Sequence, residues 1–337
     1  MEIKELLFEL SSRDAVGNIS DAADFAEKEL SKYMPVKRQS NLNIIGKIKG
    51  ESDYTIMLDA HIDQIAMVVT DIDDKGFLTV SAAGGIDIRA LSPRAVTVHG
   101  KEKITAVFAS IPPHLSSDEE KYNDISKIKL DSLLGKKAKE IVSLGDLVTF
   151  KTKPRVLSGD VVSGRSFDNR ASVACLLELA KRLSDKKLPV SVGFVLSDGE
   201  ELGLRGIRPA CFEMEPDEAI VVDVTFGDGV GINPQDCGKL GGGAMLGFSP
   251  AFCSSVSKKL RNIAKGNNIP YSEEVMGRNS GTNADMVSVS GKGVKTATVS
   301  IPLRNMHTDC EILNLNDLNS VCDLIERYIL SGGVLNA

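Results

Sequence analysis

The amino-acid sequence lacks several features that would each define a class of protein. No run of about eighteen apolar residues occurs, so no membrane partner is predicted. The opening stretch MEIKELLFELSS carries charges where a signal peptide has a long apolar core, which indicates an amphipathic helix and a cytoplasmic location. No basic excess exists, because the net charge is -6, and this argues against a nucleic-acid partner. The six cysteines form no CxxC pair, so we expect reduced thiols.

What the sequence does contain is enough apolar material for a sizeable core. Of its 337 residues, 42% are hydrophobic and 26% are charged, which is typical of a soluble globular protein, and the length suits two domains. Continuous apolar strands that alternate with helical patterns indicate an α/β sheet covered on both faces. Short alternating segments such as GFLTVSAA and KITAVFAS indicate a small antiparallel β-unit. We therefore predict an α/β domain formed by 1–66 and 160–337, which is interrupted by an inserted β domain at 67–159.

Four predicted strands of the α/β domain end in histidine or acid. These are the strands within MLDAH, VGFVLSDGEE, VVDVT and VSIPLRNMH. The polar residues that they carry are His61, Asp198, Glu200, Glu201, Asp223 and His307. A further acid, Asp168 in GRSFDNRAS, lies at the start of the helix that follows the insert. Because ligands and catalytic groups gather beyond the carboxyl ends of strands in open α/β sheets, we expect these side chains to meet in one crevice.

The chemistry of this set points to metal ions. Two imidazoles and several carboxylates, without a thiolate, suit zinc, cobalt or manganese, and one shared carboxylate is an economical way to hold two ions. Asp63 lies on the same side of an extended chain as His61 and could orient its imidazole. The adjacent Glu200 and Glu201 offer one carboxylate for a metal and one that takes a proton from water. Any one of these residues alone is more often an ordinary polar group at a strand end, so their joint occurrence carries the prediction.

The motifs together resemble a known family. AHIDQIAMVV, GRSFDNRAS, SDGEELGLRG, VVDVT and SIPLRNMHTDCE occur in this order with suitable gaps. They resemble metallopeptidase family 42, the dinuclear-metal aminopeptidases that include glutamyl and deblocking aminopeptidases and the tetrahedral peptidases. The resemblance covers nearly the whole chain. It implies an α/β fold, with a central mixed sheet flanked by helices as in zinc peptidases, and an inserted small β-barrel-like domain used in oligomerisation.

The resemblance also implies a metal-ligand set for two divalent ions, residue by residue. Asp168 matches the ligand that bridges both metals. His61 and Asp223 match the remaining ligands of one site, and Glu201 and His307 match those of the other. We expect zinc or cobalt, or else manganese, in these sites.

Two further positions match the family's catalytic residues. Glu200 matches the general base, and Asp63 matches the acid that supports the histidine. The implied function is a metal-dependent aminopeptidase that removes N-terminal residues from peptides through a metal-bridging hydroxide. The implied partners are peptides with a free N-terminus and further copies of the same chain, in an assembly such as a dodecamer.

Four positions depart from the family's usual pattern. Gln64 and Ala66 stand where members often have Glu and Gly, Asn283 stands for an acid in GTNA, and Asn305 replaces an aromatic residue. All four could alter specificity or assembly. From the residues alone, other readings also stay open: another hydrolase with two metals, such as an amidohydrolase, carboxypeptidase or deacylase; a relative labelled endoglucanase; or an inactive oligomeric shell.

Overall fold

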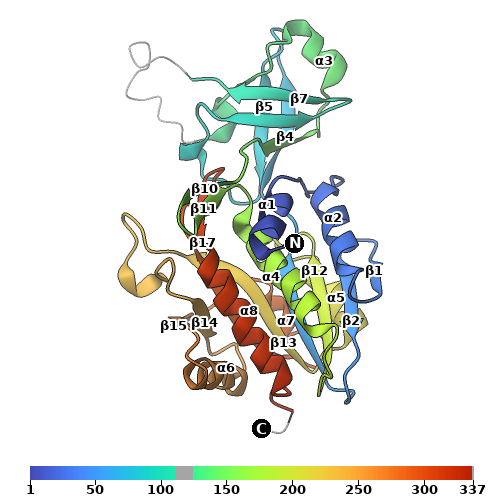
Figure 1. Cartoon of the computed structure of the whole chain (residues 1–337). Coiled ribbons are helices and arrows are strands. Elements are labelled where there is room, and N and C mark those ends of the chain that lie inside the picture. The colour runs from blue at the N-terminus through green and yellow to red at the C-terminus, as the bar shows by residue number, and fades with distance from the viewer. Residues whose placement is uncertain (111–123, 336–337) are drawn as a thin grey trace.

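The computed structural model describes residues 1–110 and 124–335 of the chain. The larger part of the molecule is built on an eight-stranded mixed sheet, and a closed six-stranded barrel lies at one end of it (Figure 1). Across the large sheet, the strands in spatial order are β1 (Val36–Arg38), β2 (Ile44–Ile48), β12 (Ser191–Ser197), β3 (Thr55–His61), β13 (Glu218–Phe226), β16 (Lys295–Leu303), β14 (Ala244–Phe248) and β15 (Tyr271–Val275).

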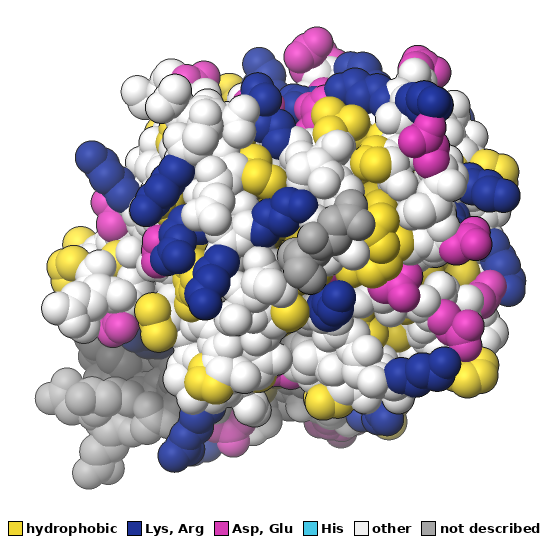
Figure 2. Space-filling model, turned by 90° about the horizontal axis from the view of Figure 1, so that it is seen from below, with side chains coloured by type: hydrophobic (Ala, Val, Ile, Leu, Met, Phe, Trp, Pro, Cys, Tyr) yellow, Lys and Arg dark blue, Asp and Glu magenta, His cyan; other side chains and the backbone are white. Residues whose placement is uncertain are grey.

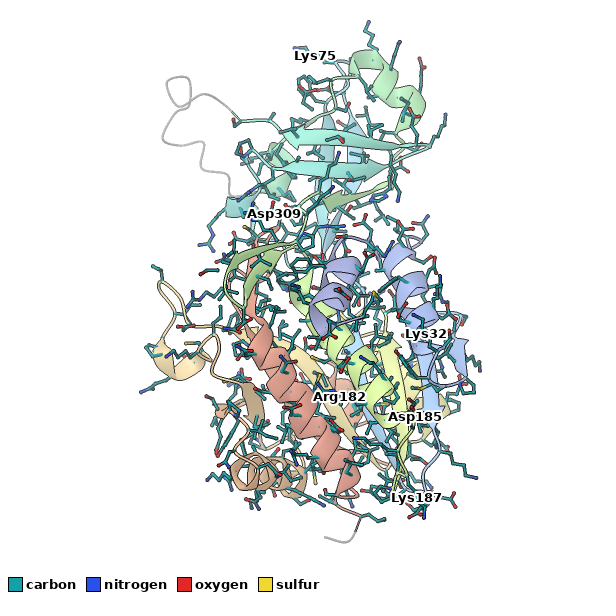
Figure 3. All side chains as sticks on the ribbon, in the orientation of Figure 1. Lys32, Lys75, Arg182, Asp185, Lys187 and Asp309 are labelled. Atoms are coloured by element: carbon teal, nitrogen blue, oxygen red, sulfur yellow. The ribbon has the colours of Figure 1, made fainter. Side chains whose placement is uncertain are left out.

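Helices cover both faces of this sheet. One face carries α1 (Ile3–Ser11), α2 (Asp21–Leu30), α4 (Phe167–Leu183), α6 (Ser254–Gly266) and α8 (Leu315–Leu330), and the other carries α5 (Ile207–Met214) and α7 (Ala284–Ser288). The central strands are therefore buried on both sides, as the seven buried residues of β3 illustrate. On the outer side of α4, Arg182 Nη1 lies 2.7 Å from Asp323 and 3.2 Å from Glu326 of α8 (Figure 3).

The barrel closes in the order β4 (Ala66–Ile72), β5 (Leu78–Ala83), β8 (Leu130–Asp131), β7 (Lys103–Phe108), β6 (Ala95–His99) and β9 (Leu147–Phe150). Its strands alternate between buried and more exposed side chains, since one side faces the barrel interior and the other faces outward. The interior is a separate apolar cluster that includes Val80, Val98 and Phe108. A short helix, α3 (Ala138–Ile141), adds Ala138 to this cluster.

A third, three-stranded sheet connects the two parts. It consists of β10 (Arg155–Ser158), β11 (Val161–Gly164) and β17 (Glu311–Asn314), and it lies between the barrel and the large sheet (Figure 1). Side chains reinforce the junction, because Thr152 Oγ1 donates a hydrogen bond of 2.6 Å to Asp309 (Figure 3). Arg165 Nη1 donates one of 2.5 Å to Asp14, whose other oxygen lies 3.6 Å from His99 of the barrel.

The predicted fold class is confirmed: a mixed sheet flanked by helices, with a small β-barrel formed by chain between β3 and α4. The boundaries at 66/67 and 159/160 stay a prediction, and the β10–β11 hairpin straddles the second one. Residues 111–123 of the predicted insert lie outside the described residues. None of the helices in the described ranges has the length and apolar character that a membrane span requires.

The end of the molecule opposite the barrel shows a mixed surface. Lysine and arginine side chains are interspersed there with acidic ones, around a scatter of hydrophobic side chains (Figure 2). Charges of both signs on one face largely cancel beyond the Debye length, so this face has no strong field of one sign.

Candidate metal centre

The four central strands β12, β3, β13 and β16 are parallel neighbours, so their carboxyl ends meet at one edge of the sheet. His61 is the last residue of β3, and Asp223 lies inside β13 near its end. Glu200 and Glu201 follow β12, and His307 follows β16. The structure thus brings together five of the residues that the sequence predicts at these strand ends, and a cavity of about 550 Å³ is lined by His61, Glu200, Glu201, Asp223 and His307.

Asp168 joins this edge from the first turn of α4. Its Oδ1 lies 3.1 Å from His61 Nε2, and its Oδ2 lies 3.3 Å from His307 Nε2. The turn is irregular, because Asp168 and Asn169 have non-helical backbone angles, and this turns the carboxylate out of the helix toward the cavity. Each oxygen of one carboxylate therefore faces a different imidazole.

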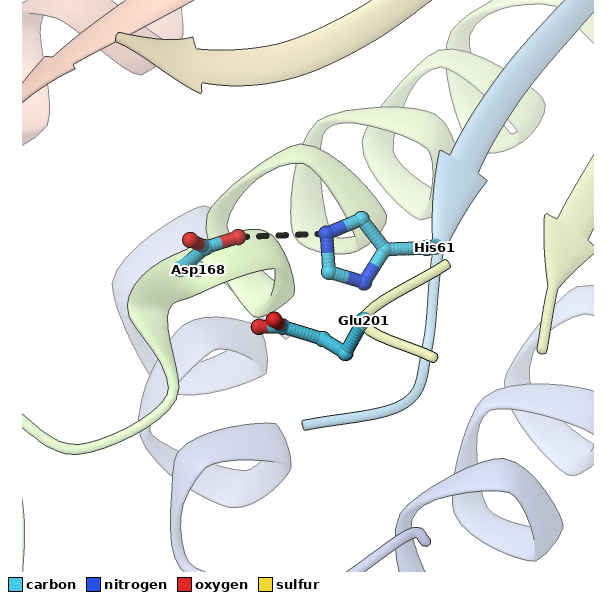
Figure 4. A group of neighbouring side chains, drawn as sticks. All are labelled: His61, Asp168 and Glu201. Atoms are coloured by element: carbon cyan, nitrogen blue, oxygen red, sulfur yellow. Dashed lines mark hydrogen bonds and ion pairs between the residues drawn. The ribbon is translucent and has the colours of Figure 1, made fainter. Parts of the chain in front are cut away.

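Two overlapping groups of side chains have the spacing that a metal ion requires. One consists of His61, Asp168 and Glu201 (Figure 4), and the other of His61, Glu200 and Asp223; within each group the candidate ligand atoms lie within 4.8 Å of one another. His307 belongs to neither group, but its Nε2 lies 3.6 Å from Glu201 Oε2. His61, in contrast, takes part in both.

Asp63 contacts both His61 and the turn that carries Glu200 and Glu201. Its Oδ1 lies 3.4 Å from His61 Nδ1, so the other ring nitrogen faces the carboxylates. Its two oxygens also accept hydrogen bonds of 3.2 Å from the backbone N–H groups of Glu200 and Glu201. One buried carboxylate therefore orients an imidazole and fixes the turn that carries both glutamates. Asp198, the first acid of that turn, does not line the cavity.

Two contributors to the site are absent from the sequence-based prediction. Glu311 is buried and accepts hydrogen bonds from the backbone N–H groups of Phe167 at 2.6 Å, Asp168 at 3.2 Å and His307 at 3.1 Å. Gly85 lies so close to His307 that an added Cβ would be 2.8 Å from its Nδ1. For Glu311 the sequence offers one signal, which is its place within the motif SIPLRNMHTDCE. For Gly85 the sequence offers no such signal.

Burial and crowding change the acidity of these groups. Burial raises the pKa of Glu200 to about 7; nearby Asp168 and Asp63 add to this increase, and His61 opposes it. Burial also raises the pKa values of Glu201 and Asp223 well above the usual range. Burial acts against the charged form of Asp168, but His307 and His61 outweigh it and hold the pKa of that carboxyl well below its usual range.

These residues fit divalent cations. Several buried carboxylates at one point repel each other and lose their hydration, and a cation is the natural compensation for both costs. Glu201 Oε1 is buried and has no hydrogen-bond partner among the described residues, so this oxygen is available to a ligand. Imidazole and carboxylate donors without a thiolate suit zinc, cobalt or manganese.

None of the four positions that depart from the resembled family's pattern is among the described residues that line the cavity. Gln64 Oε1 accepts a hydrogen bond of 3.0 Å from the buried Arg170, and Ala66 is buried at the start of β4. Asn283 Nδ2 donates hydrogen bonds of 2.9 Å to Asp59 and to Ser197. Asn305 Nδ2 donates one of 3.1 Å to the carbonyl oxygen of Cys310.

Comparison with known proteins finds aminopeptidases both among family models and among individual relatives. A family model described as M42 glutamyl aminopeptidase matches residues 43–324. A putative aminopeptidase of Acetivibrio thermocellus is 33% identical over 314 residues, which are 90% of this chain and 89% of that protein. The lysyl aminopeptidase of Pyrococcus furiosus is 30% identical over 302 residues, which are 85% of this chain and 84% of that protein.

Solved structures agree with these matches. The structure of the Pyrococcus horikoshii TET1 peptidase, which can assemble into a tetrahedron or a large octahedral shell, superimposes with a TM-score of 0.86 at 28% identity, covering 98% of this chain and 99% of that one. An aminopeptidase from the archaeon Desulfurococcus kamchatkensis superimposes with a TM-score of 0.90 at 26% identity, covering 98% and 94% of the two chains.

Proposed function

The chain belongs to the M42 glutamyl aminopeptidase family and is an aminopeptidase, a hydrolase of peptide bonds, and from this premise we propose that it works with two divalent cations at the carboxyl edge of its large sheet. The observation that carries the proposal is Asp168, whose two oxygens face His61 and His307 separately. A carboxylate in this position suits a ligand shared by two ions.

The remaining ligands divide between the two cations. His61 and Asp223 would complete one site, and Glu201 and His307 would complete the other. Zinc, cobalt and manganese all suit this donor set. When bound, the cations supply Lewis acidity, which lowers the pKa of a water molecule toward neutrality and polarises the carbonyl group of the first peptide bond.

Glu200 acts as the general base in this proposal. It takes a proton from the attacking water and passes it to the leaving amine. Its position in the cavity supports this role, and so does a pKa that burial raises to about 7, because a base works best with a pKa near the working pH. Asp63 positions both Glu200 and His61 through the contacts described above.

The first experiment measures metal content and activity on the same sample. The purified protein is chelated, reloaded with zinc, cobalt or manganese, and tested on aminoacyl-p-nitroanilides with free and with acetylated α-amines. We expect about two metals per chain, activity that follows them, and no turnover of the acetylated substrates. Folded protein that takes up no metal would contradict the ligand assignment, and turnover of the acetylated substrates would indicate a deacylase.

A second experiment tests whether Glu200 is the general base or a metal ligand. Both roles fit the geometry, because the candidate ligand atoms of His61, Glu200 and Asp223 lie within 4.8 Å of one another. Glu200→Gln should lower kcat by roughly 10²- to 10⁴-fold, the usual contribution of a general base, while two metals stay bound. Loss of one metal in this variant would show that Glu200 is a ligand. Activity close to wild type with both metals bound would remove it from the mechanism.

We also propose that the substrates are peptides with a free N-terminus and that the chain assembles with itself. The likeness to a peptidase that forms tetrahedral and octahedral shells supports self-assembly. Light scattering that gives the mass of twelve chains of 36.1 kDa would support a dodecamer, and the mass of a single chain would contradict self-assembly. The names glutamyl and lysyl both occur among the matches, so they do not define which N-terminal residue this chain prefers.

A further inference from the structure

The cavity that contains the proposed metal ligands extends along β13 beyond Asp223. Thr225 and Phe226 also line it, and Thr225 lies roughly 7 Å further along the strand than Asp223, at about 3.3 Å per residue. The lining of the cavity also includes the apolar side chains of Met276 and Met306 and the hydroxyl groups of Ser280, Thr282 and Ser300. The cavity therefore continues beyond the metal ligands as a channel whose lining contains both apolar and polar side chains.

The carboxylate of Glu274, on β15, lies at this channel. Glu274 lines the cavity, and its Oε1 accepts a hydrogen bond of 2.5 Å from Thr225 Oγ1. In the part of the chain that the structure describes, its Oε2 is buried and has no hydrogen-bond partner. Within the described ranges, no lysine, arginine or histidine comes within ion-pair distance of Glu274, whereas its neighbour Glu273 is exposed and lies 3.7 Å from Arg261.

An unpaired carboxylate in such a place is costly for the folded protein. Burial raises the pKa of Glu274, and Thr225 offsets only part of this effect. Removing a charge from water without a partner of opposite sign destabilises a protein, and groups of this kind are compensated when a partner binds. A cation that reaches the channel from the cavity would supply the partner that this carboxylate lacks within the described residues.

The shape of the channel indicates what carries that cation. Lysine and arginine side chains combine an apolar stem with a charged end, and they bury the stem along apolar surface. Phe226, Met276 and Met306 would contact the stem, and Glu274 would face the charge. A glutamate side chain in the same channel would be repelled by Glu274.

We propose that Glu274 makes this aminopeptidase select peptides that begin with lysine or arginine. The inference rests on the aminopeptidase function proposed above, because it takes the channel as the place of the first side chain of the substrate.

The test compares ligands that differ only in the charged group. Norleucine has the four-carbon stem of lysine without its amine, so lysyl- and norleucyl-p-nitroanilide are compared on zinc-loaded protein. Binding of free lysine and norleucine is measured in parallel by calorimetry. We expect kcat/KM and affinity to favour the lysyl compound by roughly ten- to a hundredfold, the usual effect of a hydrogen bond to a charged group. Glutamyl-p-nitroanilide should be the poorest substrate of the three.

Two matched variants assign the preference to one side chain. Glu274→Gln keeps the shape and removes the charge, so the ratio of lysyl to norleucyl kcat/KM should fall by at least about tenfold. Glu273→Gln makes the same change on the opposite side of the strand and should leave the ratio unchanged. The thermal midpoint of Glu274→Gln should equal or exceed that of wild type, because an uncompensated buried charge is gone.

The outcomes separate this inference from the function on which it rests. Reloaded wild-type protein that hydrolyses none of the free-amine substrates contradicts the proposed function, and the specificity inference falls with it. Protein that hydrolyses norleucyl at least as fast as lysyl substrate overturns the role of Glu274 alone. A preference for the lysyl substrate that persists in Glu274→Gln would also overturn the role of Glu274.

Discussion

The strands of the large sheet and those of the barrel are rich in similar apolar residues, but the two regions bury them differently. In β3 every residue is buried, because helices cover both faces of the sheet, whereas in β7 exposed and buried residues mostly alternate. Buried acids and histidine gather at the carboxyl edge of the large sheet, and the barrel interior is an apolar cluster. A polar residue that interrupts a strand buried on both faces is costly unless it has a ligand or a partner, so such an interruption is informative about function. Changes at the sheet edge should therefore affect chemistry, and changes inside the barrel should affect stability.

The strongest test of this contrast is Asp168→Asn. This change removes the negative charge between His61 and His307, so both proposed cations should be lost. Activity should fall by roughly a thousandfold or more, because the charge stabilisation supplied by metal ions amounts to several kcal/mol. Metal analysis and kinetics on the same sample give the answer. Asp185→Asn, at an exposed aspartate of the same chain (Figure 3), is the matched control and should behave as wild type.

Glu311→Gln tests a residue that touches none of the proposed cations. Its carboxylate accepts three backbone N–H groups next to Asp168 and His307, and an amide in its place would turn an N–H group toward one of these donors. Metal affinity should weaken by roughly 10- to 100-fold, as for other residues that orient ligands. A metal titration measures this. Unchanged affinity in the variant would mean that the two ligand loops keep their positions without Glu311.

Gly85→Ala tests the point at which chain from the barrel side reaches the site, since this glycine follows β5. A methyl group here would meet the His307 ring at 2.8 and 3.0 Å, and the ring would have to shift. We expect kcat to fall by roughly tenfold, with one of the two metals held more weakly. Gly266→Ala, where an added methyl group meets nothing within 4 Å, is the control. Equal kinetics of the two variants would show that His307 tolerates displacement.

Leu78→Ala should have the smallest effect on chemistry. Leu78 is fully buried in the barrel interior, far along β5 from Gly85, and its truncation should lower the free energy of unfolding by roughly 2–5 kcal/mol. The activity per bound metal at a temperature below the unfolding transition should stay at the wild-type level. Denaturant unfolding and kinetics measure the two quantities. A loss of kcat in folded Leu78→Ala would break the contrast between the two regions.

The sequence predicts those parts of the molecule in which one strand carries its own signal. His61, Asp223 and the pair Glu200–Glu201 each follow or interrupt an apolar run, and the parallel sheet brings these positions together. Glu311, Gly85 and Glu274 could not be assigned in this way, because their roles depend on contacts with residues far away in the chain. In YSEEV, two adjacent glutamates look equivalent, and only the pairing of β15 with β14 decides which one faces the cavity.

The closure of the barrel shows the same limit. Alternating segments predict antiparallel strands, but closure depends on the pairing of β4 with β9, which lie about eighty residues apart in the chain. Strand β10 lies within the predicted insert and β11 lies beyond its boundary, yet the two strands pair with each other, and β11 also pairs with β17. Long-range pairing of this kind leaves no mark in the local pattern.

The spread of the proposed ligands along the chain also has a consequence for protein synthesis. The first ligand is residue 61 and the last is residue 307 of 337, and the parallel strands that gather them pair across long stretches of chain. Long-range contacts of this kind form late in folding, and a chain that is still being translated lacks His307 until translation has passed all the other proposed ligands. If the proposed ligand set is right, a nascent copy that has not reached His307 would lack a complete metal centre, and the order of translation would delay peptide hydrolysis until the parallel strands have paired.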